Sequence, residues 1–167
     1  MWLASFTWPQ ILEAVVSIVA AYLLALPLAL EREANAPTRI GLRTMPLVSV
    51  GACAYVLLSR LLHEQDVFST DGLARTLRAV MTGIGFIGGG AIFKHTHDVR
   101  GLATGAAVWT AGAIGAAVAH GYYEIAIVLG IANVIVFEIP RRLTRVRRSR
   151  ERDRDAMGAP LERAHST

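Results

Sequence analysis

The sequence has one cysteine, Cys53, and few charged residues for its length. A single cysteine excludes an internal disulfide and a thiolate metal cluster, and its position in an apolar run predicts an inert, buried thiol. Charged residues make up 18% of the chain and hydrophobic residues 53%, whereas a soluble domain carries about 25% charge. This composition disfavours a soluble domain and indicates a membrane protein.

The sequence also lacks a set of side chains that would form a catalytic centre. No serine stands beside a base in a recognisable motif. The acids Glu13, Glu124 and Glu138 fall near the ends of apolar segments, not in their middle, where a costly buried charge would suggest chemistry. We therefore predict a protein that is not an enzyme and that binds no cofactor.

Five segments are apolar and long enough to cross a bilayer, which takes about 17–25 residues. They are residues 11–30, 45–62, 77–93, 102–119 and 122–139. Pro27 lies inside the first segment and predicts a kink. Arg78 and Lys94 flank the shortest segment, 77–93, and their long side chains can reach the interfaces. The expected fold is an all-α integral membrane protein, a bundle of about five transmembrane helices over residues 1–140.

Basic residues predict the orientation of these helices. Arg32, Arg39 and Arg43 lie between the first and second segments, and Lys94 and Arg100 lie between the third and fourth. Because cytoplasmic loops are enriched in Lys and Arg, we predict the N-terminus outside and the C-terminus in the cytoplasm. The first dozen residues contain no Lys or Arg, so we expect no cleavable leader and a retained first helix.

Residues 141–167 contain nine arginines and four acids but few large apolar residues. Such a segment cannot bury enough apolar surface to fold alone, and a disordered cytoplasmic tail is expected. Basic runs beside a membrane are attracted to anionic lipid. Arginine runs also bind nucleic acid, but the tail has no aromatic residue for base stacking, so we predict lipid and not nucleic acid.

Residues 82–94 are the most glycine-rich stretch of the chain. Gly83, Gly85 and Gly88 match the G-x-G-x-x-G pattern of dinucleotide-binding loops. That motif needs a preceding strand and an acidic residue about 20 positions on, and both are missing here. We therefore interpret the stretch as a membrane helix.

Glycine removes side-chain bulk, so two helices can approach closely where it lies in their contact. Gly85 and Gly89 have the small-xxx-small spacing, and residues 101–119 repeat it. A narrow passage lined by these helices is the alternative interpretation. The predicted helix-packing residues are Gly83, Gly85, Gly88, Gly89, Gly90, Gly101, Gly105, Gly112 and Gly115.

A charged cluster is predicted at the cytoplasmic ends of the helices. Its members are Glu31, Arg32, Glu33, Arg43 and Arg100. Each arginine could serve only as a topology signal, or Arg43 and Arg100 could pair with the two acids. The run His95-Thr96-His97-Asp98 resembles a metal site weakly, because two histidines at this spacing lack further ligands nearby. No metal site is predicted.

Four pieces in this order resemble the N-terminal membrane domain of the MgtC/SapB family. They are residues 28–33, 40–44, 83–90 and 99–109, and the resemblance runs from about residue 11 to 139. Ala29, Gly89 and Ala103 differ from the residues usual in the family by small-for-small changes. Longer members add a cytoplasmic domain after the last helix, which this chain is expected to lack.

The resemblance implies a multi-pass protein of the bacterial inner membrane, linked to magnesium homeostasis and to virulence. It further implies action through other membrane proteins, so such proteins, or further copies of this chain, are the expected partners besides the lipid bilayer. A small magnesium transporter or channel component is the alternative. That alternative requires oxygen ligands converging in the membrane.

Overall fold

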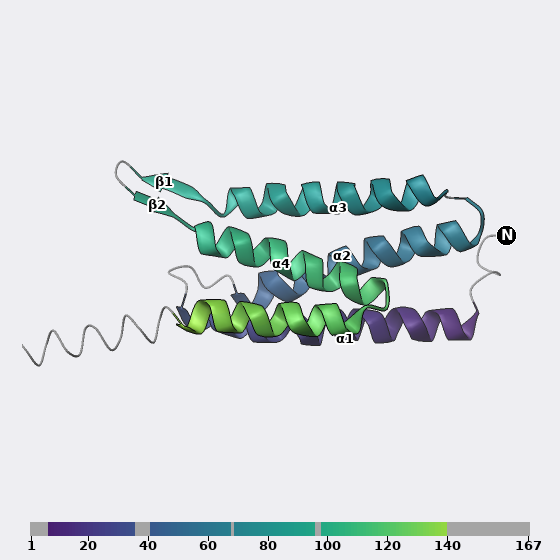
Figure 1. Cartoon of the computed structure of the whole chain (residues 1–167), viewed down its shortest axis with the longest axis horizontal. Helices are drawn as coiled ribbons and strands as arrows, with labels where there is room; N and C mark the ends of the chain where they lie inside the picture. The colour runs from purple at the N-terminus through teal and green to yellow at the C-terminus, as the bar shows by residue number, and fades with distance from the viewer. Residues whose placement is uncertain (1–6, 36–40, 68, 96–97, 140–167) are drawn as a thin grey trace, which may run out of the picture. The chain divides into compact units, whose positions relative to one another are not determined.

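The structure is a computed structural model that describes residues 7–35, 41–67, 69–95 and 98–139. The described residues form five helices and one short hairpin (Figure 1). These are α1 (Trp8–Asn35), α2 (Gly41–Glu64), α3 (Thr70–Gly90), β1 (Phe93–His95), β2 (Asp98–Arg100), α4 (Leu102–Ala119) and a fifth helix, residues 123–139. The helical fold is as predicted, whereas the antiparallel pair β1–β2 was not predicted. The predicted tail, residues 141–167, lies outside the described residues.

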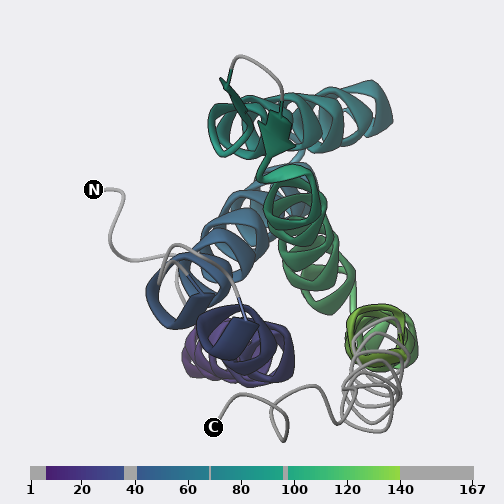
Figure 2. The ribbon, with the colours of Figure 1, turned by 90° about the vertical axis from the view of Figure 1, so that its left-hand side faces the viewer.

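The chain divides into two compact units, Met1–Val134 and Ile135–Thr167, and the packing described below is that of the first. Successive helices run in alternating directions (Figure 1). α2 and α4 pack on each other and lie between α1 and α3 (Figure 2). α1 contacts both central helices, and α3 contacts both from the opposite side.

The boundaries of α3 differ from the predicted segment 77–93. The helix begins at Thr70, because the Ser69 side chain accepts a hydrogen bond from the Gly72 N–H at 3.3 Å and so caps the first turn. It ends at Gly90, and Phe93 belongs to β1. The prediction missed the polar first turns because it followed apolar residues only, and it extended the helix past its true end.

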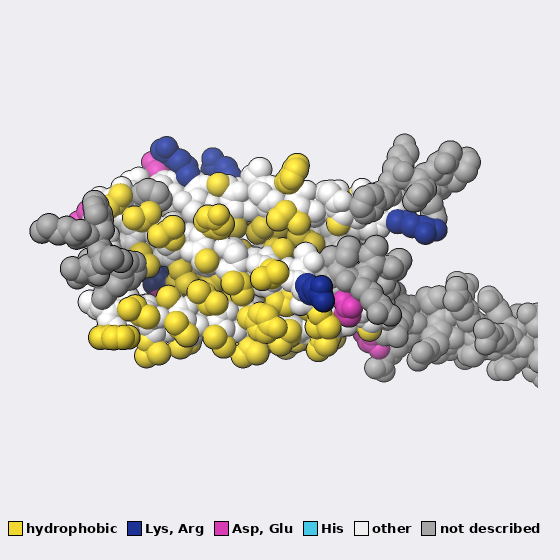
Figure 3. All heavy atoms as spheres, turned by 180° about the vertical axis from the view of Figure 1, so that it is seen from behind, with side chains coloured by type: hydrophobic (Ala, Val, Ile, Leu, Met, Phe, Trp, Pro, Cys, Tyr) yellow, Lys and Arg dark blue, Asp and Glu magenta, His cyan; other side chains and the backbone are white. Residues whose placement is uncertain are grey.

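Three of the described helices are long and apolar enough to cross a membrane: Trp8–Ala34 of α1, Gly41–Glu64 and Leu102–Ala119. α1 continues through Pro27 without a break in the helix. α3 is more polar because its first half holds Asp71, Arg75 and Arg78. Apolar side chains are spread over the middle of the face seen in Figure 3, most densely in its lower half, and charged side chains lie mostly toward its two ends. Such a distribution is expected where helices are surrounded by lipid.

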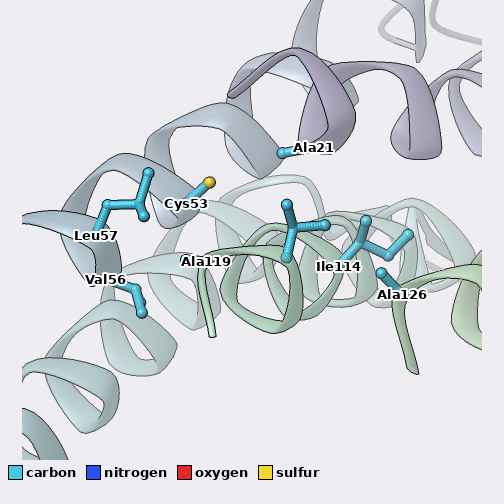
Figure 4. Packing of buried hydrophobic residues seen from close by; sticks show 8 residues of the cluster. Ala21, Cys53, Val56, Leu57, Ile114, Ala119 and Ala126 are labelled. Carbon is cyan, nitrogen blue, oxygen red and sulfur yellow. The ribbon is translucent and has the colours of Figure 1, made fainter. Parts of the chain in front are cut away.

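Small side chains make up much of the core where four helices meet (Figure 4). Ala21 of α1, Cys53 of α2, Ile114 of α4 and Ala126 of the fifth helix are all fully buried there. The buried, unpaired Cys53 is as predicted. Small residues at these positions allow the helix backbones to approach, which is where much of the packing energy between membrane helices arises.

Ser49 joins three helices at one point. Its hydroxyl donates a hydrogen bond to the Ala21 carbonyl of α1 at 3.0 Å, and both groups are buried. Its own carbonyl lies so close to Gly115 of α4 that a Cβ atom at Gly115 would overlap it. The absence of a side chain at Gly115 is therefore a condition for the contact between α2 and α4.

Glycines also bring α3 against α4. A Cβ added at Gly88 would lie 2.9 Å from the Gly105 carbonyl oxygen, and one added at Gly105 would lie 2.7 Å from that of Gly88. Two turns after Gly105 on α4, a Cβ at Gly112 would overlap the side chain of Ile84, which lies one turn before Gly88 on α3. Atoms of the neighbouring helix thus fill the space at Gly88 and Gly105, whereas Gly112 also lines a cavity of about 160 Å³ between α3 and α4.

Alanine substitutions at two adjacent glycines should change stability in opposite directions. Gly88→Ala places a methyl group against the Gly105 backbone, and such overpacking costs about 1–3 kcal/mol. Nothing lies within 4 Å of a Cβ at Gly89, so Gly89→Ala should stabilise the helix by about 0.5–1 kcal/mol. Thermal unfolding followed by circular dichroism in one detergent measures both. Equal midpoints for the two variants would contradict the close α3–α4 contact.

Candidate functional site

The charged cluster begins with an ion pair between sequence neighbours in the last turns of α1. Arg32 Nε lies 2.6 Å from Glu31 Oε2, and Arg32 donates a second hydrogen bond from its terminal nitrogen to Glu31 Oε1 at 3.0 Å. Their side chains are only 10% and 8% exposed. Neighbouring residues on a helix do not face each other, so enclosure by the surroundings holds this forked pair together.

Glu33 and Gly41 connect the end of α1 to the start of α2. The Leu42 N–H donates to Glu33 Oε2 at 3.4 Å, and the carboxylate sits where the helix N-terminus favours negative charge. A Cβ at Gly41 would overlap the Ala29 carbonyl and the Glu33 amide nitrogen. The two helix ends therefore meet backbone to backbone, and only glycine fits at the first position of α2.

Two arginines were considered as possible partners of these acids. Arg43 is exposed and forms no ion pair or hydrogen bond in the described part of the chain. Of the two roles left open for Arg43, pairing with Glu31 or Glu33 is not found among the described residues, because Glu31 binds Arg32 and Glu33 accepts from the α2 backbone. Arg100 is the last residue of β2 and is exposed. Gly101 follows it with φ at +89°, a left-handed conformation that favours glycine.

The predicted helix-packing glycines fall into two groups. Five of them meet a neighbouring element: Gly88, Gly101, Gly105, Gly112 and Gly115. The other four have nothing within 4 Å of an added Cβ: Gly83, Gly85, Gly89 and Gly90. Only Ile84 and Gly88 of α3 are buried. The Gly85-xxx-Gly89 pair that the sequence singled out thus faces away from the rest of the described chain.

The alternative motifs find no support in the geometry. Gly83, Gly85 and Gly88 lie inside the continuous helix α3, without the strand and turn that a dinucleotide loop requires. His95 and Asp98 pair across the hairpin register, while Thr96 and His97 lie outside the described residues. Among the residues described, no three His, Cys, Asp or Glu side chains come together as a metal site would need.

A second charged group, which the sequence analysis missed, lies at the opposite ends of these helices. Arg60 of α2 donates to the Ala119 carbonyl at the end of α4 and lies 3.4 Å from Glu13 of α1. Glu64 is 3.8 Å from Arg60, one turn on. The i,i+4 spacing of Arg60 and Glu64 was the available signal. Partial burial, and secondarily the Arg60 charge, lower the pKa of the adjacent His120.

These features describe surfaces and helix contacts. The charged cluster joins α1 to α2, packed glycines join α4 to α3 and to α2, and the unpacked Gly85 and Gly89 lie on a bare side of α3. A comparison with protein families matches residues 18–146 to the family described as MgtC. The chain belongs to the MgtC family. The matched residues include all of the charged cluster and every glycine discussed above.

Relatives at similar identity carry related names. "Putative magnesium transporter YhiD" of Escherichia coli K12 is 32% identical over 79% of this chain and 62% of its own length. "Protein MgtC" of Brucella abortus is 32% identical over 83% of this chain and 56% of its own length. "Protein MgtC" of Salmonella paratyphi A is 31% identical over 84% of this chain and 59% of its own length. The chain therefore spans less than two thirds of these relatives.

Membership of the MgtC family and the apolar helices together show a membrane protein. The relatives' names link the family to magnesium. No solved structure matches the chain, so the packing of this MgtC family member is taken from its own coordinates.

Loss of Arg32 should destabilise the protein strongly. Arg32→Met removes the guanidinium group that binds both oxygens of the enclosed Glu31 carboxylate, and breaking such a pair from one side costs about 3–5 kcal/mol. The double variant Glu31→Gln, Arg32→Met should recover part of the loss, because no enclosed charge is left behind. The free energy of unfolding in detergent is measured for the unchanged chain, the single variant and the double variant.

Arg78→Met is the matched control for this experiment. Arg78 is exposed on α3, and a surface substitution of this kind should change stability by no more than about 0.5 kcal/mol. If Arg32→Met unfolds no more readily than Arg78→Met, the ion pair does not hold the end of α1.

Proposed function

We propose that this MgtC family member is a non-enzymatic, multi-pass protein of the bacterial inner membrane that serves magnesium homeostasis by binding other membrane proteins. The observation that carries the proposal is the bare side of α3. Gly85 and Gly89 have the spacing that lets a second helix approach closely, yet no described residue lies within 4 Å of a Cβ at either position. At Gly88 of α3 and Gly105 of α4, by contrast, the backbone of the neighbouring helix occupies the space that a Cβ would take.

The flanking residues favour a protein partner at this surface. Phe86 lies between the two glycines in sequence and is 84% exposed. Aromatic residues dominate the energetics of protein contacts when they are buried on binding. We call the surface formed by Thr82, Gly85, Phe86 and Gly89 the outer face of α3. A partner helix on this face would find two positions for close approach and one large side chain to pack against.

The magnesium link comes from the family and from the names of relatives. One relative is named as a magnesium transporter, which favours ion transport as the second candidate function. A hard cation such as Mg²⁺ needs several oxygen ligands at one place. The described residues offer no such group of acids, so partner binding is the better supported of the two functions.

We further propose that all five helices cross the membrane, with the N-terminus outside and the C-terminus in the cytoplasm. The alternating directions of the helices place Arg32, Arg43 and Arg100 at the same end of the bundle (Figure 1). Basic residues at one end mark the cytoplasmic side. The Arg60 group at the other end then faces the outside.

Single cysteines at the two ends test this orientation. Gln65→Cys, in the turn after α2, should react with a membrane-impermeant maleimide added to spheroplasts, while Ala34→Cys in α1 should react only after lysis. Both positions are exposed. The unchanged chain should not be labelled, because Cys53 is fully buried. The reverse pattern would contradict the orientation. Labelling of both cysteines from outside would contradict the membrane span of α2, which lies between them.

Partner binding is tested by adding bulk to the outer face of α3. Gly89→Leu should lower the amount of membrane protein that co-purifies with the tagged chain, from host cells grown in low and high magnesium, by about tenfold, as loss of one well-packed contact does. The side chain enters open space, so the fold should be kept. Gly115→Leu is unsuitable, because it would strike the Ser49 carbonyl.

Ala54→Leu is the control, because it adds similar bulk at an exposed position of α2. Quantitative mass spectrometry of the purified complexes gives the readout. Equal recovery with Gly89→Leu and the unchanged chain, both folded by circular dichroism, would reject partner binding at this face. Magnesium flux into liposomes that hold the purified chain alone, above that into empty vesicles, would support the transporter instead.

A further inference from the structure

A groove of about 820 Å³ runs between α2 and α3. Its α2 wall is a stripe of residues spaced by four, Arg43, Leu47, Gly51 and Tyr55. Such a stripe lies along one face of a helix, and its 12 steps cover about 18 Å at about 1.5 Å per residue. α2 diverges from α3 toward its own N-terminal end (Figure 2). The groove is therefore long, narrow and aligned with the helices.

The walls of the groove are apolar and are hollowed by glycine. Leu47 is 67% exposed and Tyr55 65% exposed, although both line a cavity within a membrane protein. Gly51 of α2 and Gly83 of α3 also line it, and a Cβ at either would point into open space. Two missing side chains thus make room for a slender apolar ligand.

One end of the groove is positively charged. Arg43 is the charged residue among those that line it, and no acid lies among them. The Arg43 side chain is exposed and forms no ion pair with the described residues, and Thr44 beside it adds a hydroxyl group. An anion at this end would meet a guanidinium fork suited to phosphate.

We propose that this groove binds an anionic phospholipid, with one acyl chain between α2 and α3 and the headgroup phosphate on Arg43. The length of the groove suits an acyl chain that reaches from one interface toward the middle of a bilayer core about 30 Å thick. Its volume lies within the about 300–1,000 Å³ of ligand pockets. Basic pockets between membrane helices on the cytoplasmic side bind anionic headgroups, and Arg43 lies on that side in the proposed orientation.

A protein helix fits the groove less well. A helix could place only one residue near Arg43, whereas a phosphate offers several acceptor oxygens to the guanidinium group. The charge therefore favours lipid.

Photo-crosslinking tests the proposal in vesicles that contain the full chain. Phosphatidylglycerol with a diazirine in its acyl chain is photolysed, and adducts are mapped by peptide mass spectrometry. The reference for ordinary surrounding lipid is the exposed face of α1 at Val15, Val16 and Val19. Adducts at Leu47 and Tyr55 should exceed those on α1, and unlabelled phosphatidylglycerol should compete better than phosphatidylcholine.

Two pairs of variants separate the acyl site from the charge. Gly83→Leu fills the groove and should reduce its labelling to the level of α1, whereas Ala54→Leu, at an exposed position of α2 outside the groove, should not. Arg43→Gln should lower the preference for phosphatidylglycerol over phosphatidylcholine about fivefold, as one basic residue near an anionic surface contributes. Arg78→Gln, an exposed arginine outside the groove, should leave that preference unchanged.

Groove labelling no stronger than that of α1 in the unchanged chain would overturn the proposal. So would equal labelling with Gly83→Leu, or an unchanged headgroup preference with Arg43→Gln. A photo-reactive amino acid placed at Leu47 that cross-links to protein instead of lipid would show a helix or a second copy there. The experiment needs membrane insertion but neither the proposed orientation nor a partner on the outer face of α3, so those proposals can fail separately.

Discussion

Close approach of helix backbones at positions without a side chain is the constraint on which this fold depends. Gly115 admits the Ser49 carbonyl, Gly88 and Gly105 admit each other, and Gly41 admits the end of α1. In a bilayer the hydrophobic effect does not drive helices together, because lipid tails are as apolar as the side chains. Contact area and buried hydrogen bonds must supply the association, and the Ser49 to Ala21 bond is one of these. Bulk at any of these positions separates two helices instead of filling a gap.

The position of α3 follows from this constraint and explains the two surfaces to which function is assigned. α3 packs through a narrow strip around Ile84 and Gly88, so most of its circumference remains uncovered. One uncovered side carries Gly85 and Gly89 and is open to a helix of another protein. The other side, with Gly83, forms a wall of the α2–α3 groove. The glycines of the two surfaces lie on different faces of α3, and Phe86, which belongs to the outer face and also lines the groove, lies where the two surfaces meet.

Charged groups occupy the ends of the helices and restrict how these ends meet. The Glu31–Arg32 pair and the Glu33 contact to Leu42 hold α1 and α2 together at one end, and Arg60 connects α2, α4 and α1 at the other. The use of these acids within the chain leaves Arg43 available for an external anion. Because the two acids are already bound within the chain, Arg43 is the charge that remains for binding. The family match covers these residues except Glu13, the α1 partner of Arg60.

The sequence by itself determined the helical class, the apolar segments and the family, because these depend on local composition and on motif order. Residues 102–119 were predicted to the residue, since apolar length and flanking glycine are local properties. The tertiary structure alone decided which glycines pack, because Gly88 and Gly89 are alike in composition and differ only in the direction that each faces on α3. It also decided that Arg32 and not Arg43 binds Glu31, and that Arg60 reaches the end of α4, because pairing depends on which helix ends meet in space. The predicted segment 77–93 ran three residues past the end of α3 for the same reason. The apolar residues after Gly90 lead into strand β1, which pairs with β2.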